Sequence, residues 1–277
     1  RYISKIKEIL GLDNWLNLEI TEGRRHSFHL ARKAAEEKHD IVVACGGDGT
    51  AHEVVNGVIS SGVSIPVGFI PFGASNAYAL SLGIPANPTE ACQIILRKKI
   101  RSIDLGKTCN QFVSHYFLSM AGIGFDAEAT YLVKPLLKEI FGGVPAHILA
   151  GAYGLVRFDR TKLFVEIDGS PHVGYQMLIF NGKFYGAGLK AASNADMTDG
   201  YLDVYLFKQG RKRDFLRYVM GVVGGHYSRF KDVEYFRTKK IKIDASRKTW
   251  VQLDGEVVGT LPQEFEICSQ AIKVITA

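Results

Sequence analysis

Three turns in this chain carry residues that could do chemistry, and the first is rich in glycine. Gly46-Gly47-Asp48-Gly49-Thr50 directly follows the apolar run Ile41–Cys45. Glycines let a backbone turn sharply and pass close to a ligand. A strand that leads through such a turn into a helix forms an anion site, because free amide groups and the helix dipole point at the turn. We therefore expect a phosphate there, and an acid held between glycines fits phosphate–metal chemistry.

The other two turns carry carboxylates. Asn194–Tyr201 places Asp196 and Asp199 three residues apart. Hard cations prefer such oxygen-rich turns, although a plain Asp-Gly hairpin is an alternative. Further on, Asp254 and Glu256 flank a glycine. Phosphoryl transfer to an alcohol needs a carboxylate within hydrogen-bond reach of the hydroxyl, so this turn could supply a general base.

The elements that position the glycine turn can be inferred from the same stretch. Ile41–Cys45 is too short for a helix and does not alternate, so we expect a strand covered on both faces, as in a parallel sheet beneath helices. Thr50 and Glu53 stand at capping-box spacing before a helical apolar pattern, so we expect the helix to begin at Thr50. A tight strand-to-helix turn that binds nothing is the alternative.

The first hundred residues alternate between helical and strand patterns. We expect helices at Ile3–Leu10, His26–Lys38 and Asn87–Leu96, and strands at Leu18–Thr21, Ile41–Cys45 and Ile65–Ile70. This alternation predicts right-handed βαβ crossovers and an open parallel sheet. The strand at Ile65–Ile70 leads into a second turn and helix start. Ligands of such sheets lie beyond the carboxyl ends of the strands, so both turns should face one crevice that holds a nucleotide.

Strand patterns become dense in the second half of the chain. They lie at Phe112–Met120, Leu163–Ile167, Val173–Phe180, Tyr201–Phe207, Ile241–Ile243, Thr249–Leu253 and Phe265–Cys268, and Asp-Gly or Asn-Gly turns separate several of them. We expect a mainly antiparallel β-sandwich with inserted helices. Phe141–Val156 is uncharged but short for a membrane span and contains Pro145, so a buried or lipid-facing helix is expected there.

Composition sets the class of protein. At 277 residues the chain suggests two domains, and 47% hydrophobic with 22% charged residues is typical of a folded globular protein. The formal charge of +6 and the pI of about 9.0 suit an anionic partner: a nucleotide, an acidic membrane surface or nucleic acid. Four widely spaced cysteines without a CxxC pair indicate reduced thiols in a cytoplasmic protein. The chain begins at Arg1 without a signal-like segment, so we expect the natural N-terminus to lie upstream.

The glycine turn resembles the GGDGT signature shared by diacylglycerol kinase catalytic domains, sphingosine and ceramide kinases, and NAD kinases. A second block resembles the PxGTxNxxA pattern followed by Gly-Ile-Pro, which NAD kinases lack, and a third resembles IDLG. The matching residues are Pro71, Gly73, Asn76, Ala79, Gly83–Pro85 and Ile103–Gly106. With the two later acidic turns in order, the chain is similar to bacterial diacylglycerol kinase-family enzymes over almost its whole length. It departs from them at Ala74, where Thr or Ser is usual, and at Ala77, where bacterial members often have Asp.

The resemblance implies an α/β, NAD kinase-like two-domain fold. A parallel-sheet nucleotide domain would span residues 1–105, joined by 270–277, and a mainly antiparallel β-sandwich domain for lipid and metal would span 106–269. The implied metal is Mg²⁺, held by the Asp199 carboxylate and the carbonyls of Asp196 and Tyr201. The implied nucleotide-binding residues are Thr21, Gly46, Gly47, Asp48, Gly49, Thr50, Glu53, Gly73, Ala74 and Asn76.

Two residues are candidates for catalysis under this resemblance. In bacterial relatives the Glu of the Asp-Gly-Glu turn is the base, which corresponds to Glu256 here. In sphingosine kinases the Asp of the glycine turn, here Asp48, has that part. We assign Glu256 as the base and Asp48 to the metal–phosphate network.

The sequence thus predicts an ATP- and Mg²⁺-dependent kinase that transfers the γ-phosphoryl group to the hydroxyl of a membrane lipid resembling diacylglycerol. Two alternatives stay open: a sphingosine-like long-chain-base kinase, suggested by His52–Gly57 and Asn76-Ala77, and a catalytically weak lipid- or nucleotide-binding relative, suggested by Ala74 and Ala77. We expect a cytoplasmic protein, peripheral at the inner face of an anionic membrane, without a nucleic-acid partner and with a homodimer left open.

Overall fold

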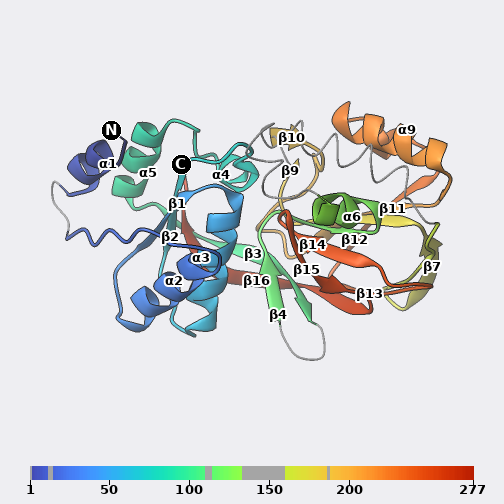
Figure 1. Cartoon of the computed structure of the whole chain (residues 1–277), viewed down its shortest axis with the longest axis horizontal. Coiled ribbons are helices and arrows are strands. Elements are labelled where there is room, and N and C mark those ends of the chain that lie inside the picture. The colour runs from blue at the N-terminus through green and yellow to red at the C-terminus, as the bar shows by residue number, and fades with distance from the viewer. Residues whose placement is uncertain (1, 12–14, 110–113, 133–159, 186–187) are drawn as a thin grey trace. The chain divides into compact units, whose positions relative to one another are not determined.

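The computed structural model describes residues 2–11, 15–109, 114–132, 160–185 and 188–277. The chain forms two compact units (Figure 1). One consists of Arg1–Ile103 with Gln270–Ala277, and the other of Asp104–Ser269. Two long strands, β3 (Ile100–Cys109) and β16 (Gln263–Ile275), belong partly to each unit.

The first unit contains a parallel sheet, as predicted. β1 (Val42–Gly46) pairs in parallel with β2 (Val67–Pro71), and the end of β16 pairs in parallel with the other edge of β2. Because β2 lies between two strands, all five of its residues are buried, whereas β1 is at the end of the strand order and half-exposed. Only Cys45 of β1 is exposed, so the prediction that β1 is covered on both faces was wrong at that residue. The helices of this unit are α1 (Tyr2–Gly11), α2 (His26–Glu36), α3 (Asp48–Ser60), α4 (Ala77–Ser81) and α5 (Pro88–Arg97).

Two local expectations for the first unit were wrong. Residues 15–22 form an irregular, mostly exposed segment, so the strand expected at residues 18–21 is absent from this described stretch and Thr21 is exposed. In addition, α3 begins at Asp48 instead of Thr50. Gly47 has the extended conformation of an N-cap residue, with φ −89° and ψ −171°, which places Thr50 inside the first helical turn.

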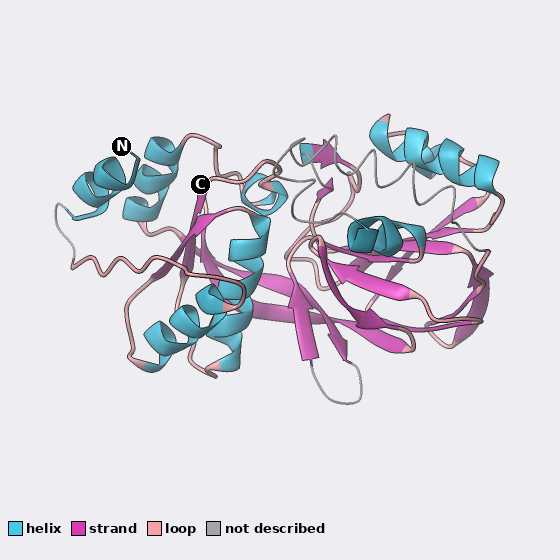
Figure 2. Ribbon diagram, in the orientation of Figure 1, coloured by secondary structure: helices cyan, strands magenta, loops and turns pink. Residues whose placement is uncertain are grey.

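The second unit is an antiparallel β-sandwich, as predicted (Figure 2). One sheet has the order β16-β13-β6-β7, with β3 paired to β16 and to β4, and the other has the order β12-β11-β8-β5-β14-β15. Buried side chains from both sheets form one core, including Phe117, Val165, Ile179 and Phe265. The strands are β4 (Ser114–Phe117), β5 (Met120–Ile123), β6 (Leu163–Ile167), β7 (Ser170–Gly174), β8 (Gln176–Phe180), β9 (Phe184–Tyr185), β10 (Leu189–Lys190), β11 (Leu202–Phe207), β12 (Val233–Thr238), β13 (Lys240–Ala245), β14 (Trp250–Leu253) and β15 (Glu256–Thr260).

Helices cover the outer face of the six-stranded sheet. Tyr218 from α9 (Lys212–Val223) and Tyr227 from η2 (Tyr227–Arg229) pack on Phe207 of β11. On the same sheet, α6 (Phe125–Leu132) contacts β14. Because β8 and β11 have both faces covered, every residue in them is buried, which explains why their sequences are apolar except at Gln176 and Asp203.

Two predicted strands are divided in the structure. The stretch expected at 112–120 contains β4 and the first residue of β5, separated at Leu118 and Ser119, and its first two residues lie outside the described ranges. The stretch expected at 173–180 contains the end of β7 and all of β8, because the chain crosses from one sheet to the other at Tyr175. The helix expected at 141–156 also lies outside the described residues. None of the helices in the described ranges is long and apolar enough to span a bilayer.

Candidate active site

The two glycine turns of the first unit are in backbone contact. A β-carbon on Gly73 would lie 2.6 Å from the Cα of Gly47, and a β-carbon on Gly47 would lie 3.0 Å from the Cα of Gly73. The amide of Phe72 donates to the carbonyl of Gly46 at 2.9 Å. The ends of β1 and β2 therefore bring the two predicted nucleotide turns together, and only glycine leaves room for this approach.

Asn76 shapes the second of these turns. Its Oδ1 accepts from the amide of Gly73 at 2.8 Å, and its Nδ2 donates to the carbonyl of Gly73 at 2.7 Å. Its backbone is left-handed, with φ 49°, a conformation that Asn tolerates better than most residues. Asn76 thus closes the turn around Gly73, while Ala74 is exposed between them.

Asp48 connects the two turns. Its Oδ1 accepts from the amide of Tyr78 in the first turn of α4 at 3.2 Å. The N-cap residue of α4, Asn76, gives that helix no side-chain cap, so the carboxylate of Asp48 supplies an acceptor. On the other side, the hydroxyl of Thr50 lies against Gly46, where a β-carbon would be 2.5 Å from Oγ1. Glycine is needed at positions 46 and 47 because a β-carbon at either would lie too close to Thr50 or Gly73.

Glu53 of α3 links α3 to α2 and does not cap α3. One carboxylate oxygen accepts from the amide of Arg25 at 2.8 Å, and the other accepts from the hydroxyl of Ser27. These donors lie at the start of α2, so Glu53 of α3 acts as its capping acceptor. The capping box expected with Thr50 is not formed. The contacts that the resemblance implies between nucleotide and Thr21, Glu53 or the glycine turns stay predictions.

The second unit presents Glu256 on a firmly held hairpin. Asp254 and Gly255 both have positive φ, 49° and 87°, and form the two-residue turn between β14 and β15. The carboxylate of Asp254 accepts from the amides of Leu118, Ser119 and Met120 at 2.8, 2.8 and 3.0 Å. Glu256 follows as the first residue of β15 and is half-buried. A carboxylate on such a support has a defined position, which general-base catalysis requires.

A second acid supports the same hairpin, and sequence reasoning did not single it out. The Oδ2 of Asp126 accepts from the side-chain Nε2 of Gln252 at 2.7 Å, and the Oε1 of Gln252 accepts from the backbone amide of Gly255 at 2.7 Å. Tyr185 donates its hydroxyl to the other oxygen of Asp126, and burial raises the pKa of Tyr185 well above its usual value. Asp126 follows a buried strand and Gly124 at a helix start. Asp48 likewise follows a strand and a glycine at a helix start, and that pattern could have identified Asp126.

The predicted magnesium turn is held by an arginine. The Oδ1 of Asp199 accepts from the amide of Tyr201 at 3.0 Å, and its Oδ2 forms an ion pair with Arg237 at 2.7 Å. The guanidinium of Arg237 also lies 4.3 Å from the ring centroid of Tyr201. Asp196 accepts from its neighbour Thr198. The oxygen chemistry suits Mg²⁺, but a metal would have to displace Arg237 from Asp199. No group of three or more His, Cys, Asp or Glu side chains in the described ranges is placed to hold a metal.

Asp203 lies next to this turn in β11 and is almost fully buried, with 1% of its surface exposed. Burial raises the pKa of its carboxyl, and the charge of Asp199 raises it further, while a hydrogen bond from Tyr235 and the charge of Arg237 act in the opposite direction. Its Oδ2 has no hydrogen-bond partner in the part of the chain that the structure describes.

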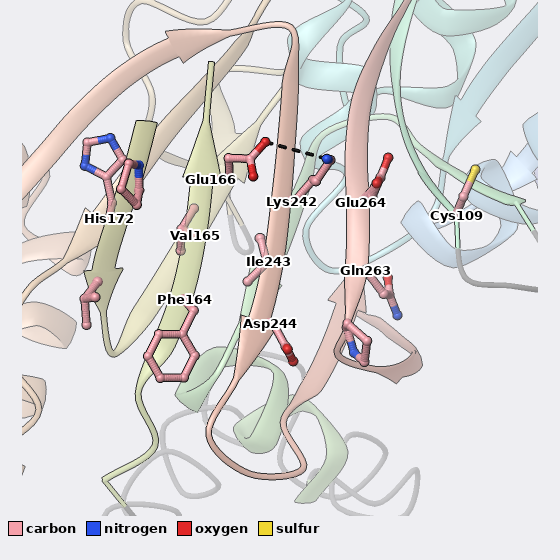
Figure 3. Close-up of a pocket in the computed structure, with 13 residues that line it drawn as sticks. Cys109, Phe164, Val165, Glu166, His172, Lys242, Ile243, Asp244, Gln263 and Glu264 are labelled. Atoms are coloured by element: carbon pink, nitrogen blue, oxygen red, sulfur yellow. Dashed lines mark ion pairs between the residues drawn. The ribbon is translucent and has the colours of Figure 1, made fainter. Parts of the chain in front are cut away.

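A shallow pocket of about 530 Å³ lies elsewhere in the second unit. Figure 3 shows it over β6, β7, β13 and β16, with an ion pair between Glu166 and Lys242. None of the predicted site residues lines it. The residues to which the sequence analysis assigns chemistry therefore lie outside this pocket.

Family models match nearly the whole chain. Residues 1–108 match the diacylglycerol kinase catalytic domain, and residues 119–276 match the YegS C-terminal NAD kinase beta sandwich-like domain. These matches define a two-domain lipid kinase fold. The chain belongs to the diacylglycerol kinase family and is a lipid kinase, a phosphotransferase. Kinase activity implies use of ATP.

Named relatives agree with this assignment. A protein named diacylglycerol kinase from Bacillus subtilis (strain 168) is 32% identical over 250 residues, which cover 89% of this chain and 81% of the relative. One from Staphylococcus aureus (strain JH9) is 30% identical over 238 residues, covering 85% and 74%. A crystal structure of a protein named diacylglycerol kinase from Bacillus anthracis str. Sterne has a TM-score of 0.75 at 21% identity and covers 100% of this chain and 90% of that one. This likeness shows the same fold.

Proposed function

We propose that this lipid kinase transfers the γ-phosphoryl group of ATP to the free hydroxyl of a diacylglycerol-like membrane lipid. The observation that carries the proposal is the match to relatives named diacylglycerol kinase over 85–89% of this chain. The expected cellular setting is peripheral, at the inner face of the membrane.

The proposed roles follow from the geometry of each turn. The nucleotide phosphates would bind at the paired glycine turns, where α3 begins at Asp48 and its N-cap residue Gly47 has no side chain to occupy the first-turn amides. Asp48 would belong to the metal–phosphate network. Glu256 would accept the proton of the lipid hydroxyl as that oxygen attacks phosphorus.

We also propose Mg²⁺ as the cation, with the Asp199 carboxylate and the carbonyls of Asp196 and Tyr201 as ligands in the second unit. When bound, the cation would neutralise negative charge near the site. Because Arg237 now pairs with Asp199, we expect Arg237→Ala to strengthen Mg²⁺ binding to the protein without nucleotide. Titration calorimetry would measure this, and unchanged or weaker Mg²⁺ binding would favour a plain structural turn.

A transfer assay with radiolabelled ATP tests the proposed substrate. The panel would contain 1,2-diacylglycerol, monoacylglycerol, ceramide and sphingosine, each in mixed micelles. We expect label in the phosphorylated diacylglycerol. Preferential labelling of sphingosine would favour the long-chain-base alternative. Binding of ATP without labelling of any lipid would favour the catalytically weak alternative, in which Ala74 and Ala77 have replaced functional side chains.

A further inference from the structure

The helix α9 has an apolar stripe on its outer face. Leu216, Met220 and Val223 are 53%, 60% and 53% exposed, and their i, i+4, i+7 spacing places them on one side of the helix. The opposite side packs on the second unit through the buried residues Phe215 and Tyr218. Figure 1 shows α9 on the outside of this unit. The sheet beneath α9 covers only one of its two apolar sides, and an exposed apolar patch of this kind can mark an interaction surface.

The segment that contains α9 is rich in basic residues. Residues 208–234 contain seven basic residues (Lys or Arg) and three acidic residues (Asp or Glu). This tenth of the chain therefore carries +4 of the formal net charge of +6. Lys208 pairs with Glu234 and Arg217 with Asp232. The other basic side chains, all exposed, are Arg211, Lys212, Arg213, Arg229 and Lys231.

The basic residues and the stripe share one face at the start of α9. Lys212 lies one helical turn before Leu216, and Arg213 lies three residues before Leu216 and seven before Met220. An apolar strip with cations along its margin is the pattern of a helix that lies in the plane of a membrane interface.

We propose that α9 docks this protein on the surface of an anionic lipid bilayer. The stripe of Leu216, Met220 and Val223 enters the boundary between headgroups and acyl chains, and the exposed cations contact anionic headgroups. Each basic residue close to such a surface strengthens binding about fivefold. The proposal rests on the proposed function in one respect, because a lipid substrate brings the protein to a bilayer.

A bilayer fits this surface better than a second copy of the chain. A two-fold interface between two copies of α9 would place each patch against its own duplicate and bring like charges together. A soluble polyanion would satisfy the cations but leave three apolar side chains in water. An anionic bilayer supplies both negative charge and an apolar layer.

The test compares two double variants in vesicle sedimentation without ATP. Leu216→Gln/Arg213→Gln removes one apolar and one cationic side chain from α9. The matched control, Ile3→Gln/Lys7→Gln, removes the same kinds of side chain from the exposed face of α1, where Ile3 is 52% exposed. With phosphatidylglycerol vesicles we expect the α9 variant to bind at least about tenfold more weakly and the control within about twofold of wild type. Phosphatidylcholine vesicles should bind wild type weakly.

Several outcomes would overturn the docking proposal. The proposal fails if the α9 variant binds vesicles as strongly as wild type does, or if the control variant loses as much binding as the α9 variant. It also fails if wild type binds phosphatidylcholine vesicles as strongly as phosphatidylglycerol vesicles. A dimer by light scattering that the α9 variant loses, with vesicle binding unchanged, would assign the stripe to a second copy. Thermal unfolding of each variant checks that it is folded.

Turnover of a short-chain diacylglycerol below its critical micelle concentration separates this proposal from the proposed function. We expect the α9 variant to keep wild-type turnover in that assay. If wild type phosphorylates no lipid while the α9 variant still loses vesicle binding, the proposed function fails and docking stands. If turnover of the short-chain lipid is normal and vesicle binding is unaffected by the variant, docking fails and the proposed function stands.

Discussion

The two turns that carry Asp48 and Glu256 are constructed in opposite ways. In the first unit, space decides the structure, because the glycine turns after β1 and β2 approach so closely that a β-carbon would lie 2.6 Å from backbone. In the second unit, hydrogen bonding decides it, because Asp254 accepts from three successive residues of the neighbouring segment. The first turn depends on glycines, which have no side chain, and the second depends on the side chain of Asp254.

Similar Asp-Gly pairs therefore have different tasks in the two units. The carboxylate of Asp48 stands at the start of α3 and links the two turns through Tyr78. The carboxylate of Asp254 holds the hairpin on which Glu256, the proposed base, lies. The motif alone does not reveal this division, which depends on the donors that each carboxylate meets.

The largest expected effect is on kcat, and it distinguishes the proposed role of Glu256 from that of Asp48. Glu256→Gln keeps size and hydrogen bonding but cannot accept a proton, so we expect kcat to fall about 10²–10⁴-fold with little change in the Kd for ATP. Asp48→Asn should also lower kcat, but through the metal–phosphate network, so nucleotide or Mg²⁺ affinity should fall with it. Steady-state kinetics and equilibrium ATP binding on both variants measure the contrast.

Near wild-type turnover in Glu256→Gln, together with inactivity of Asp48→Asn, would reverse the assignment and make Asp48 the base. Thermal unfolding of both variants is the control, because neither substitution removes a buried apolar group.

The next effect is on stability. Asp254→Ala removes an acceptor shared by three backbone amides, and bonds to a charged acceptor are worth more than neutral ones, so we expect a loss of about 2–4 kcal/mol in the free energy of unfolding. Asp48→Ala should cost less, since its bond to the amide of Tyr78, at 3.2 Å, is longer than each of the three that Asp254 accepts. Chemical denaturation of the two variants, side by side, checks the contrast. Equal losses would show that Asp48 is as structural as Asp254.

A smaller effect tests the contact between the glycine turns. Gly73→Ala forces its methyl group against Gly47 and Asn76, at 2.6 Å from backbone and 2.9 Å from Oδ1, so the turns must separate at a cost of about 1–3 kcal/mol. We expect weaker ATP binding. Gly23→Ala is the matched control, because a β-carbon there meets nothing within 4 Å. ATP affinity equal to wild type in Gly73→Ala would show that the paired turns do not hold the nucleotide.

Local sequence predicted those parts of the fold that short-range chemistry determines. Asp168-Gly169 and Asp254-Gly255 form the expected hairpin turns with positive φ. The parallel order of β1 and β2 also followed from the alternation of elements. The turns depend on neighbours within a few residues, and the order of β1 and β2 on the succession of elements along the chain.

Long-range contacts determined what the sequence did not reveal. β1 is half-exposed because of its place in the strand order, which no pattern within it records. Asp126 supports the Glu256 hairpin through Gln252, a partner 126 residues away. The expected partner of Glu53 was Thr50, but Arg25 and Ser27 of another helix bind it.

The smallest expected effect is on the pH dependence of stability, and it concerns Asp203, whose Oδ2 has no hydrogen-bond donor in the described part of the chain. Burial raises the pKa of Asp203, so the folded state holds its proton more tightly than the unfolded chain does. Stability should therefore fall as pH rises from the unfolded pKa through the raised folded value, and the penalty should persist at neutral pH. In Asp203→Asn this slope should be flatter, and Tm at pH 7 should rise by no more than about 4 °C, since a neutral amide costs less to bury than a carboxylate. Calorimetric melting of both proteins between pH 4 and pH 8 provides the measurement. A lower Tm for the variant at pH 7 would show that the charged form of Asp203 is favoured in the folded protein, as it would be beside a bound cation, and that Asp203 resembles Asp254 after all.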